Sequence, residues 1–291
     1  MRTMVLSLAV LAALGLAGCS GSGSGTPQGQ AATQGTTAAS APSQLASSVS
    51  GTIGLSNPQA HKLSDKAVLT IKLQDVSLQG AAPLASKTIS PIASLPVSFN
   101  FKLTPHEIHA SDLYVVQAEI VDGVRHYTMP LQAPVLTRGA TNHADIRLVA
   151  QLTPAEEMMG AFKKLKGDAG AMKMTKGTAL SSKVSRGWQV FHDPTTGKVR
   201  YVVELANYVK GGFTHTQFAY QDGKPWVVIQ VTKPNQHALP SQIDRAGWDA
   251  DGKLVLMDKV EGNSTTTLDA ATAAKLHADA VAMLSRAQKT R

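Results

Sequence analysis

Apolar and polar residues alternate with a period of two along much of the chain, which is the pattern of half-buried β-strands. Residues 97–103 place four apolar side chains on one face of a strand and three polar ones on the other. The same alternation runs through residues 69–73, 114–120 and 146–152, and Asp122-Gly123 between two such runs predicts a hairpin. Six or seven strands with no long helix predict a β-sandwich over residues 49–152.

A helical pattern follows the predicted sandwich. Thr153-Pro154-Ala155-Glu156 predicts a helix start, with a capping Thr, a Pro at the first helical position and a Glu placed for a capping box. From Lys163 to Arg186 there are seven basic residues and one acid, so residues 153–186 are predicted to be a short helix and a basic linker. Docking of the helix on the sandwich is favoured over its lying on an anionic membrane surface.

Strand patterns return after residue 186 and are richer in aromatic side chains. The dipeptides Asp222-Gly223 and Asp251-Gly252 predict hairpins between antiparallel strands, and residues 268–288 have helical spacing. Residues 187–291 are therefore predicted to form an antiparallel β-meander closed by a C-terminal helix. The whole chain is predicted to be mainly β, with an N-terminal β-sandwich followed by a smaller α+β domain.

The hydrophobic content, the net charge and the cysteine count exclude some classes of protein. A hydrophobic content of 43% argues against wholesale disorder, and the formal net charge of +8 indicates an anionic partner such as a glycan or lipid headgroups. One cysteine, Cys19, excludes an internal disulfide framework and a Cys-rich zinc site.

The first 18 residues have the features of a secretory signal peptide, with a positive start, a short apolar run and small residues before the cut. Leu16-Ala17-Gly18-Cys19 matches the bacterial lipobox, which predicts transfer of a diacylglyceryl group to the thiol, cleavage between Gly18 and Cys19, and acylation of the new amino terminus with a fatty acid such as palmitate. An ordinary signal that contains a cysteine by chance is the alternative. Ser20 resembles the sorting pattern for the outer membrane.

Residues 19–48 are predicted to be a disordered tether that follows the lipidated cysteine. They contain no charged residue and are mostly Ser, Gly, Thr, Ala and Gln, which cannot bury enough apolar surface to fold. A flexible chain of this length spans roughly 30 Å, enough to hold a folded domain clear of the headgroups.

Five segments of the predicted sandwich carry a family resemblance. They are Val49-Ser50-Gly51-Thr52, Leu73-Gln74-Asp75-Val76-Ser77-Leu78, Val97-Ser98-Phe99, the run 114–123, and Pro134-Val135-Leu136-Thr137-Arg138-Gly139. In this order they resemble the YbaY-type lipoprotein domain, a family similar to the pilotin lipoproteins that escort secretin subunits in type III secretion. The resemblance covers residues 49–152 and implies a lipid-anchored sandwich facing the periplasm, with no catalytic residues.

These observations predict a non-enzymatic lipoprotein, anchored to the outer membrane and facing the periplasm, that acts as a binding or pilotin-like chaperone module for an envelope protein. The alternative is a peptidoglycan-binding or polysaccharide-binding lipoprotein. Its aromatic platform would consist of His215, Tyr220, Trp226 and Trp248. Packing of the same aromatic side chains in a core, without any ligand, is the simpler explanation.

The sequence gives little support for metal binding, nucleic-acid binding or catalysis. His106 and His109 are three residues apart, not the four of a zinc-binding helix, so no metal or other cofactor is predicted. Nucleic acid is excluded as a partner because the lysines lack interleaved aromatic side chains. The chain has no nucleophile elbow, Walker loop or dinucleotide fingerprint, and a hydrolase built from scattered His and Asp is the least favoured class.

Overall fold

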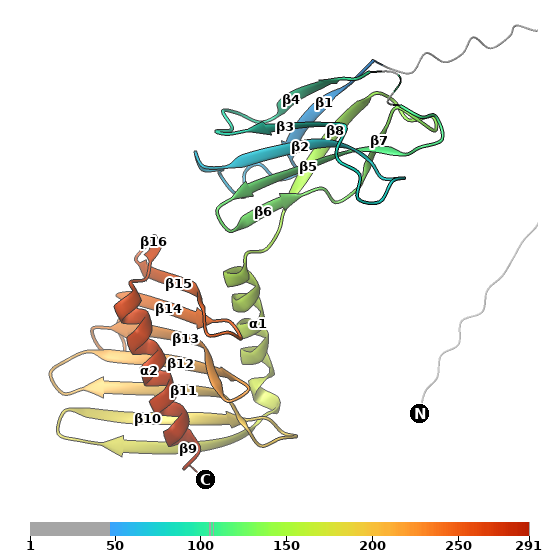
Figure 1. Ribbon diagram of the computed structural model, residues 1–291. Helices are drawn as coiled ribbons and strands as arrows, with labels where there is room; N and C mark the ends of the chain where they lie inside the picture. The colour runs from blue at the N-terminus through green and yellow to red at the C-terminus, as the bar shows by residue number, and fades with distance from the viewer. Residues whose placement is uncertain (1–46, 105, 107, 291) are drawn as a thin grey trace, which may run out of the picture. The chain divides into compact units, whose positions relative to one another are not determined.

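The computed structural model describes residues 47–104, 106 and 108–290, which form two sheets with separate cores (Figure 1). Gly18, Cys19 and the predicted tether up to residue 46 lie outside the described residues. Within the described part, neither helix combines the length and the apolar character needed to cross a bilayer.

The first sheet has eight strands in the order β3-β2-β5-β6-β8-β1-β4, and β7 pairs with β5. Its strands are antiparallel neighbours except β1 and β8, which are parallel. The strands are β1 Ser48–Leu55, β2 Val68–Asp75, β3 Ala85–Ile89, β4 Val97–Lys102, β5 Tyr114–Asp122, β6 Arg125–Thr128, β7 Ala133–Val135 and β8 His143–Ala150.

Apolar residues that alternate with polar ones in the sequence are the buried residues of the strands. In β2, Leu69, Ile71 and Leu73 are fully buried, whereas the residues between them are at least partly exposed. Because β2 and β5 pair with Ile71 opposite Ala118, the apolar faces of both strands enter one core. The predicted hairpin at Asp122-Gly123 is confirmed: Asp122, the last residue of β5, pairs with Arg125 of β6, and Gly123 in the turn between them has a positive φ of 62°.

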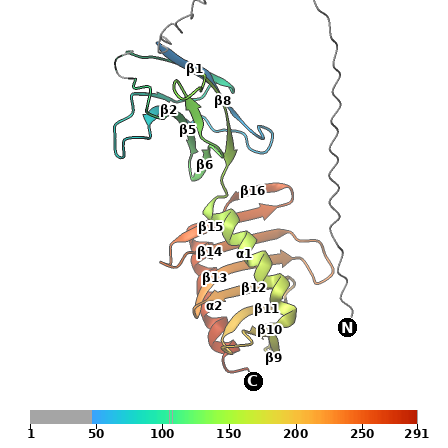
Figure 2. The same cartoon turned by 90° about the vertical axis from the view of Figure 1, so that its right-hand side faces the viewer.

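The second sheet is an uninterrupted meander in which each of eight strands pairs with the next along the chain (Figures 1 and 2). The helix α1 Pro154–Asp168 precedes it, followed by a 3₁₀ turn at Ala169–Ala171, and α2 Ala270–Ala287 ends it. The strands are β9 Lys173–Leu180, β10 Val184–His192, β11 Val199–Tyr208, β12 Phe213–Gln221, β13 Lys224–Lys233, β14 Gln242–Trp248, β15 Leu254–Glu261 and β16 Ser264–Thr267.

The two helices cover opposite faces of this sheet. Consecutive residues alternate between the two cores: Phe218 packs in the cluster of α2, and Ala219 packs in the cluster of α1. The buried face of α1 consists of Met158, Phe162 and Leu165. The second domain is therefore a helix, a sheet and a helix in three layers (Figure 2).

The structure differs from the sequence-based prediction between residues 153 and 186. The capping box at Thr153 and Glu156 is present, but α1 docks on the second sheet and not on the sandwich. The predicted basic linker contains β9, an edge strand whose side chains are mostly exposed. Gly177 in β9 leaves room for the indole of Trp188, which a Cβ would overlap. With α1 and β9 included, the second domain is the larger of the two.

Candidate partner-binding groove

One edge of β5 loses its regular pairing in the middle of the first sheet. Along this edge β5 pairs with β7 through residues 114–116 and with β6 through residues 120–122. Between these ladders the chain leaves the sheet at residues 129–132, and the amide of Ala118 donates to Sδ of Met129 at 3.0 Å. A thioether is a weak acceptor, so this contact replaces a stronger ladder bond.

The interruption opens a groove of about 430 Å³ on the first sheet. Its floor comes from β2 and the middle of β5, and its outer wall is the connection between β6 and β7. The lining residues are Thr70, Lys72, residues 115–119 and residues 128–132. This volume lies within the range that protein sites use to bury a ligand or a short peptide segment.

The groove combines an apolar wall with a charged rim. Val115 is buried in its floor, whereas Leu131 on its wall is 80% exposed. Lys72 and Glu119 supply one charge of each sign, and Nδ1 of His126 lies 2.7 Å from Oε1 of Glu119. An exposed aliphatic side chain above a hollow is a feature of surfaces that bind another chain.

A second hollow, of about 380 Å³, lies on the other side of the same connection. It is lined by residues 129–134 and by residues 143–147, which belong mainly to β8. The segment 129–132 therefore borders two hollows, and a ligand on either side would contact Leu131.

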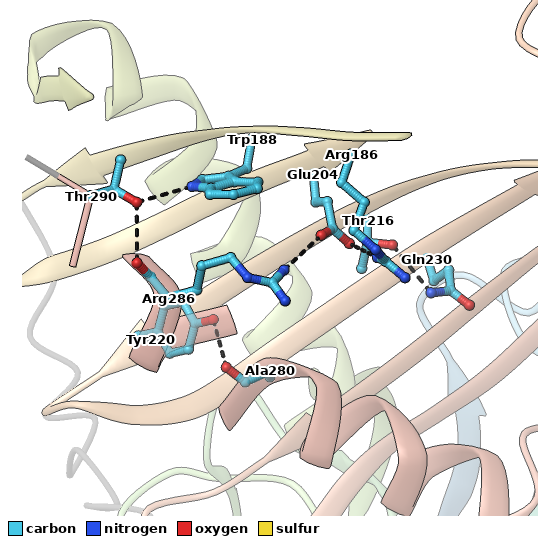
Figure 3. A network of polar contacts seen from close by, with 9 residues as sticks. All are labelled: Arg186, Trp188, Glu204, Thr216, Tyr220, Gln230, Ala280, Arg286 and Thr290. Atoms are coloured by element: carbon cyan, nitrogen blue, oxygen red, sulfur yellow. Dashed lines mark hydrogen bonds and ion pairs between the residues drawn. The ribbon is translucent and has the colours of Figure 1, made fainter. Parts of the chain in front are cut away.

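The four residues of the predicted aromatic platform do not form one surface. Tyr220 is fully buried beneath α2, where its hydroxyl donates to the carbonyl of Ala280 at 2.9 Å (Figure 3). Trp248 packs in the same core, edge-on to His277. Trp226 packs against the cluster of α1. The structure brings together only Trp226 and Trp248, which border a hollow of about 80 Å³ at one end of the sheet.

His215 lies apart from these aromatic residues, between Leu205 and Val231 of the neighbouring strands. Its burial lowers the pKa of the imidazole, and the positive charges of Lys166 and Lys233 lower this pKa further. The side chain is therefore held in its neutral form around pH 7.

Sequence patterns did not indicate the charged network that joins α2 to the sheet (Figure 3). Glu204, whose side chain is 6% exposed, accepts from Arg186 at 2.9 Å and from Arg286 at 3.3 Å. The guanidinium of Arg286 also lies 5.2 Å from the ring centre of Trp188, and Nε1 of Trp188 donates to Thr290. Each charged side chain in this network has a partner of opposite charge, and the network links α2 to β10 and β11.

Metal chemistry has no assembled site in the part of the chain that the structure describes, where no three His, Cys, Asp or Glu side chains converge. The main feature of the first sheet is therefore the groove beside β5.

The groove lies within a segment of the chain that matches a known protein family. Residues 44–148 match the family model of the type III secretion system lipoprotein chaperone, YscW. One similar solved structure is described as an alternative pilotin from the type II secretion system of Vibrio cholerae. It shares 28% identity over 36% of this chain and 96% of its own, with a TM-score of 0.32. A search of curated proteins found no match.

The family match ends at residue 148, before α1 and the second sheet. It confirms the pilotin-like segment that the sequence predicted, and the YbaY-type assignment stays a prediction. Residues 44–148 of this chain are thus similar to the lipoprotein chaperones of type III secretion.

Proposed function

We propose that this protein is a non-enzymatic, pilotin-like lipoprotein whose first domain binds a segment of an envelope protein in the groove beside β5. The observation that carries the proposal is the coincidence of this groove with the segment similar to lipoprotein chaperones. A chaperone of this kind needs a binding surface and a membrane anchor, and it needs no catalytic group.

The groove suits a peptide segment with aliphatic side chains. Leu131 and Val115 offer apolar contacts, and Lys72 and Glu119 can orient polar atoms of the bound chain. In addition, β5 presents a stretch of edge between its pairings with β7 and β6, where an added chain can form main-chain hydrogen bonds.

The anchor of the proposal is Cys19, acylated after cleavage at Gly18. Several acyl chains on one cysteine hold a protein firmly at a bilayer, since each buried methylene contributes about 0.8 kcal/mol. Ser20 after the cysteine favours the outer membrane, with the folded domains facing the periplasm. Cell fractionation of the Cys19→Ser variant tests this part, and its recovery with the outer membrane at the native level would contradict the anchor.

Photocrosslinking in intact cells tests the groove. A photoreactive residue at position 131 is expected to capture an envelope protein that the same residue at position 78 does not. Leu78 is the matched control because it is also exposed, at 58%, and belongs to the same domain. Equal labelling from both positions would contradict the groove as the binding site.

A second variant links the captured protein to the groove. Leu131→Asp places a charge on the apolar wall and is expected to reduce recovery of the partner at least tenfold, because charged groups are costly to bury at an interface core. Leu78→Asp is expected to leave recovery unchanged. The circular dichroism of both variants should match that of the native protein, since both side chains are exposed.

Polysaccharide binding is the second candidate function, favoured by the hollow that Trp226 and Trp248 share with Lys224 and Asp249. Aromatic rings beside polar groups are suited to sugar faces and hydroxyls. Sedimentation with purified sacculi tests this candidate: loss of binding in Trp226→Ala would support it, and a native protein that stays in the supernatant would eliminate it.

A further inference from the structure

Three hairpin tips lie side by side at one end of the second sheet, on its left-hand side in Figure 1. They connect β9 to β10, β11 to β12 and β13 to β14. Main-chain bonds join them: the amide of Val209 donates to the carbonyl of Lys183, and the amide of Gly212 donates to that of Pro234, both at 3.0 Å. We call residues 180–186, 207–214 and 232–242 the tip surface.

The tip surface is positively charged. It contains Lys183, Arg186, Lys210, Lys233 and His237, and it contains no Asp or Glu. Arg186 is held by the buried Glu204, but no ion pair within the described part of the chain involves any of the three lysines. The neighbouring tip between β15 and β16 carries Glu261, which is paired with Lys259 at 2.9 Å.

The opposite end of the same sheet has a different charge pattern. Its three turns carry Lys198, Lys224 and Lys253 together with Asp193, Asp222, Asp249 and Asp251. Aspartates outnumber lysines in these three turns, whereas the three hairpin tips of the tip surface have basic residues and no acidic ones. The fold does not require this asymmetry, because both ends of the sheet consist of connections between antiparallel strands.

Large aliphatic side chains project from the same tips. Leu180, Val209 and Leu239 are 82%, 71% and 86% exposed. Among the described residues, none of the exposed large hydrophobic side chains lies in the three opposite turns. The apolar side chains and the unpaired lysines therefore occur together, at one end of the sheet.

We propose that the tip surface binds the surface of a bilayer containing anionic phospholipids. The three aliphatic side chains enter the region between headgroups and acyl chains, and Lys183, Lys210 and Lys233 bind lipid phosphates. Aliphatic side chains at the tips with lysines around them match the chemistry of such an interface. A protein partner would instead require a continuous apolar centre with a polar rim, whereas each of these tips has a lysine together with its aliphatic side chain.

Flotation with lipid vesicles tests the proposal. The chain from Ser20 onward keeps every described residue and lacks the acylation site, so any binding comes from the protein itself. It is expected to float with vesicles of phosphatidylcholine and phosphatidylglycerol, to remain unbound with phosphatidylcholine alone, and to dissociate as salt is raised.

Three variants of this chain assign the binding to the tip surface. Lys183→Gln, Lys210→Gln and Lys233→Gln together are expected to weaken binding on the order of a hundredfold, since each lysine near an anionic surface contributes about a fivefold factor. Leu180→Ser, Val209→Ser and Leu239→Ser together are expected to weaken it at least tenfold. The matched control, with Lys198, Lys224 and Lys253 changed to Gln, is expected to bind as the native chain does. Equal unfolding midpoints show that all variants are folded.

Three results would overturn the proposal. The first is a native chain that does not float with the anionic vesicles. The second is an equal loss of binding in the control at the opposite end of the sheet, which would indicate an effect of net charge alone. The third is a native chain that sediments as a dimer and becomes a monomer when the three aliphatic side chains are replaced, which would assign the tips to a second copy of the chain.

Discussion

Replacement of both arginines around Glu204 is expected to destabilise the second domain much more than replacement of the Glu204 carboxylate itself. Glu204 is 6% exposed, whereas Arg186 and Arg286 are 29% and 41% exposed. Without its partners the carboxylate remains in the core with no cation, whereas the arginines without Glu204 can turn toward water. The two perturbations break the same ion pairs but leave different groups unpaired.

The magnitude follows from this difference in burial. Two opposite charges about 4 Å apart attract by about 4 kcal/mol at an effective dielectric constant near 20, and the desolvation of the carboxylate cancels much of that gain. Removal of the partners leaves the desolvation uncompensated, so Arg186→Met with Arg286→Met is expected to cost about 3–5 kcal/mol of unfolding free energy. Loss of the contact between Arg286 and Trp188 adds about 0.5–1 kcal/mol.

Urea unfolding monitored by tryptophan fluorescence suits this test because all three tryptophans, at positions 188, 226 and 248, lie in the second domain. Glu204→Gln alone is expected to cost only about 1–2 kcal/mol, because a neutral amide retains one or two hydrogen bonds. Glu204→Gln added to the double arginine variant should restore part of the lost stability. If that triple variant is less stable than the double variant, the buried charge is not the source of the loss and the reasoning is refuted.

Two further perturbations test local packing and charge. Gly177→Ala is expected to cost about 1–3 kcal/mol because its Cβ would overlap the ring of Trp188; Gly187→Ala, with open space at its Cβ, is the control, and equal urea midpoints for both would contradict this account. Arg125 and the amide of Thr153 lower the pKa of Glu156 from 4.5 to about 2. This pair therefore stabilises the fold above pH 4.5 and loses its effect as the pH falls toward 2. Because Glu156 is 39% exposed, the effect is expected to be about 1 kcal/mol or less. Acid titration of the helical circular dichroism should show Arg125→Ala unfolding at a higher pH than the native protein, and coincident curves would contradict the assignment.

Sequence patterns predicted the elements whose signals are local. The alternation in β2, β4 and β5, the hairpin at Asp122-Gly123 and the capping box at Thr153 each depend on fewer than ten consecutive residues, and the structure confirms them. At Asp222-Gly223 both residues have positive φ, 51° and 77°, as a two-residue hairpin turn of this kind requires.

Features that depend on distant parts of the chain were not predicted. The parallel pairing of Gly51 with Ala144 joins segments about ninety residues apart, and the pair Glu204 and Arg286 joins β11 to α2. β9 escaped prediction because an edge strand exposed on both faces has no need of alternation, and its lysines resembled those of a linker. The groove beside β5 was not predicted for a related reason. The interruption of strand pairing that forms it depends on the path of the chain after β6, and no local sequence motif indicates that path.

The surfaces proposed for binding in the two domains share one physical feature. Leu131 follows Pro130 in the first domain, and Leu239 precedes Pro240 in the second. A proline fixes its own φ and restricts the backbone of the residue before it, so Pro130 stiffens the chain that leads to Leu131, and Pro240 restricts Leu239 itself. A segment with less backbone freedom loses less entropy when a partner immobilises it. Both leucines are at least 80% exposed, which is unfavourable in water unless something covers them. In a regular strand the backbone groups are paired and the apolar face is buried, so the most exposed aliphatic side chains of this protein lie where pairing is interrupted or where the chain turns.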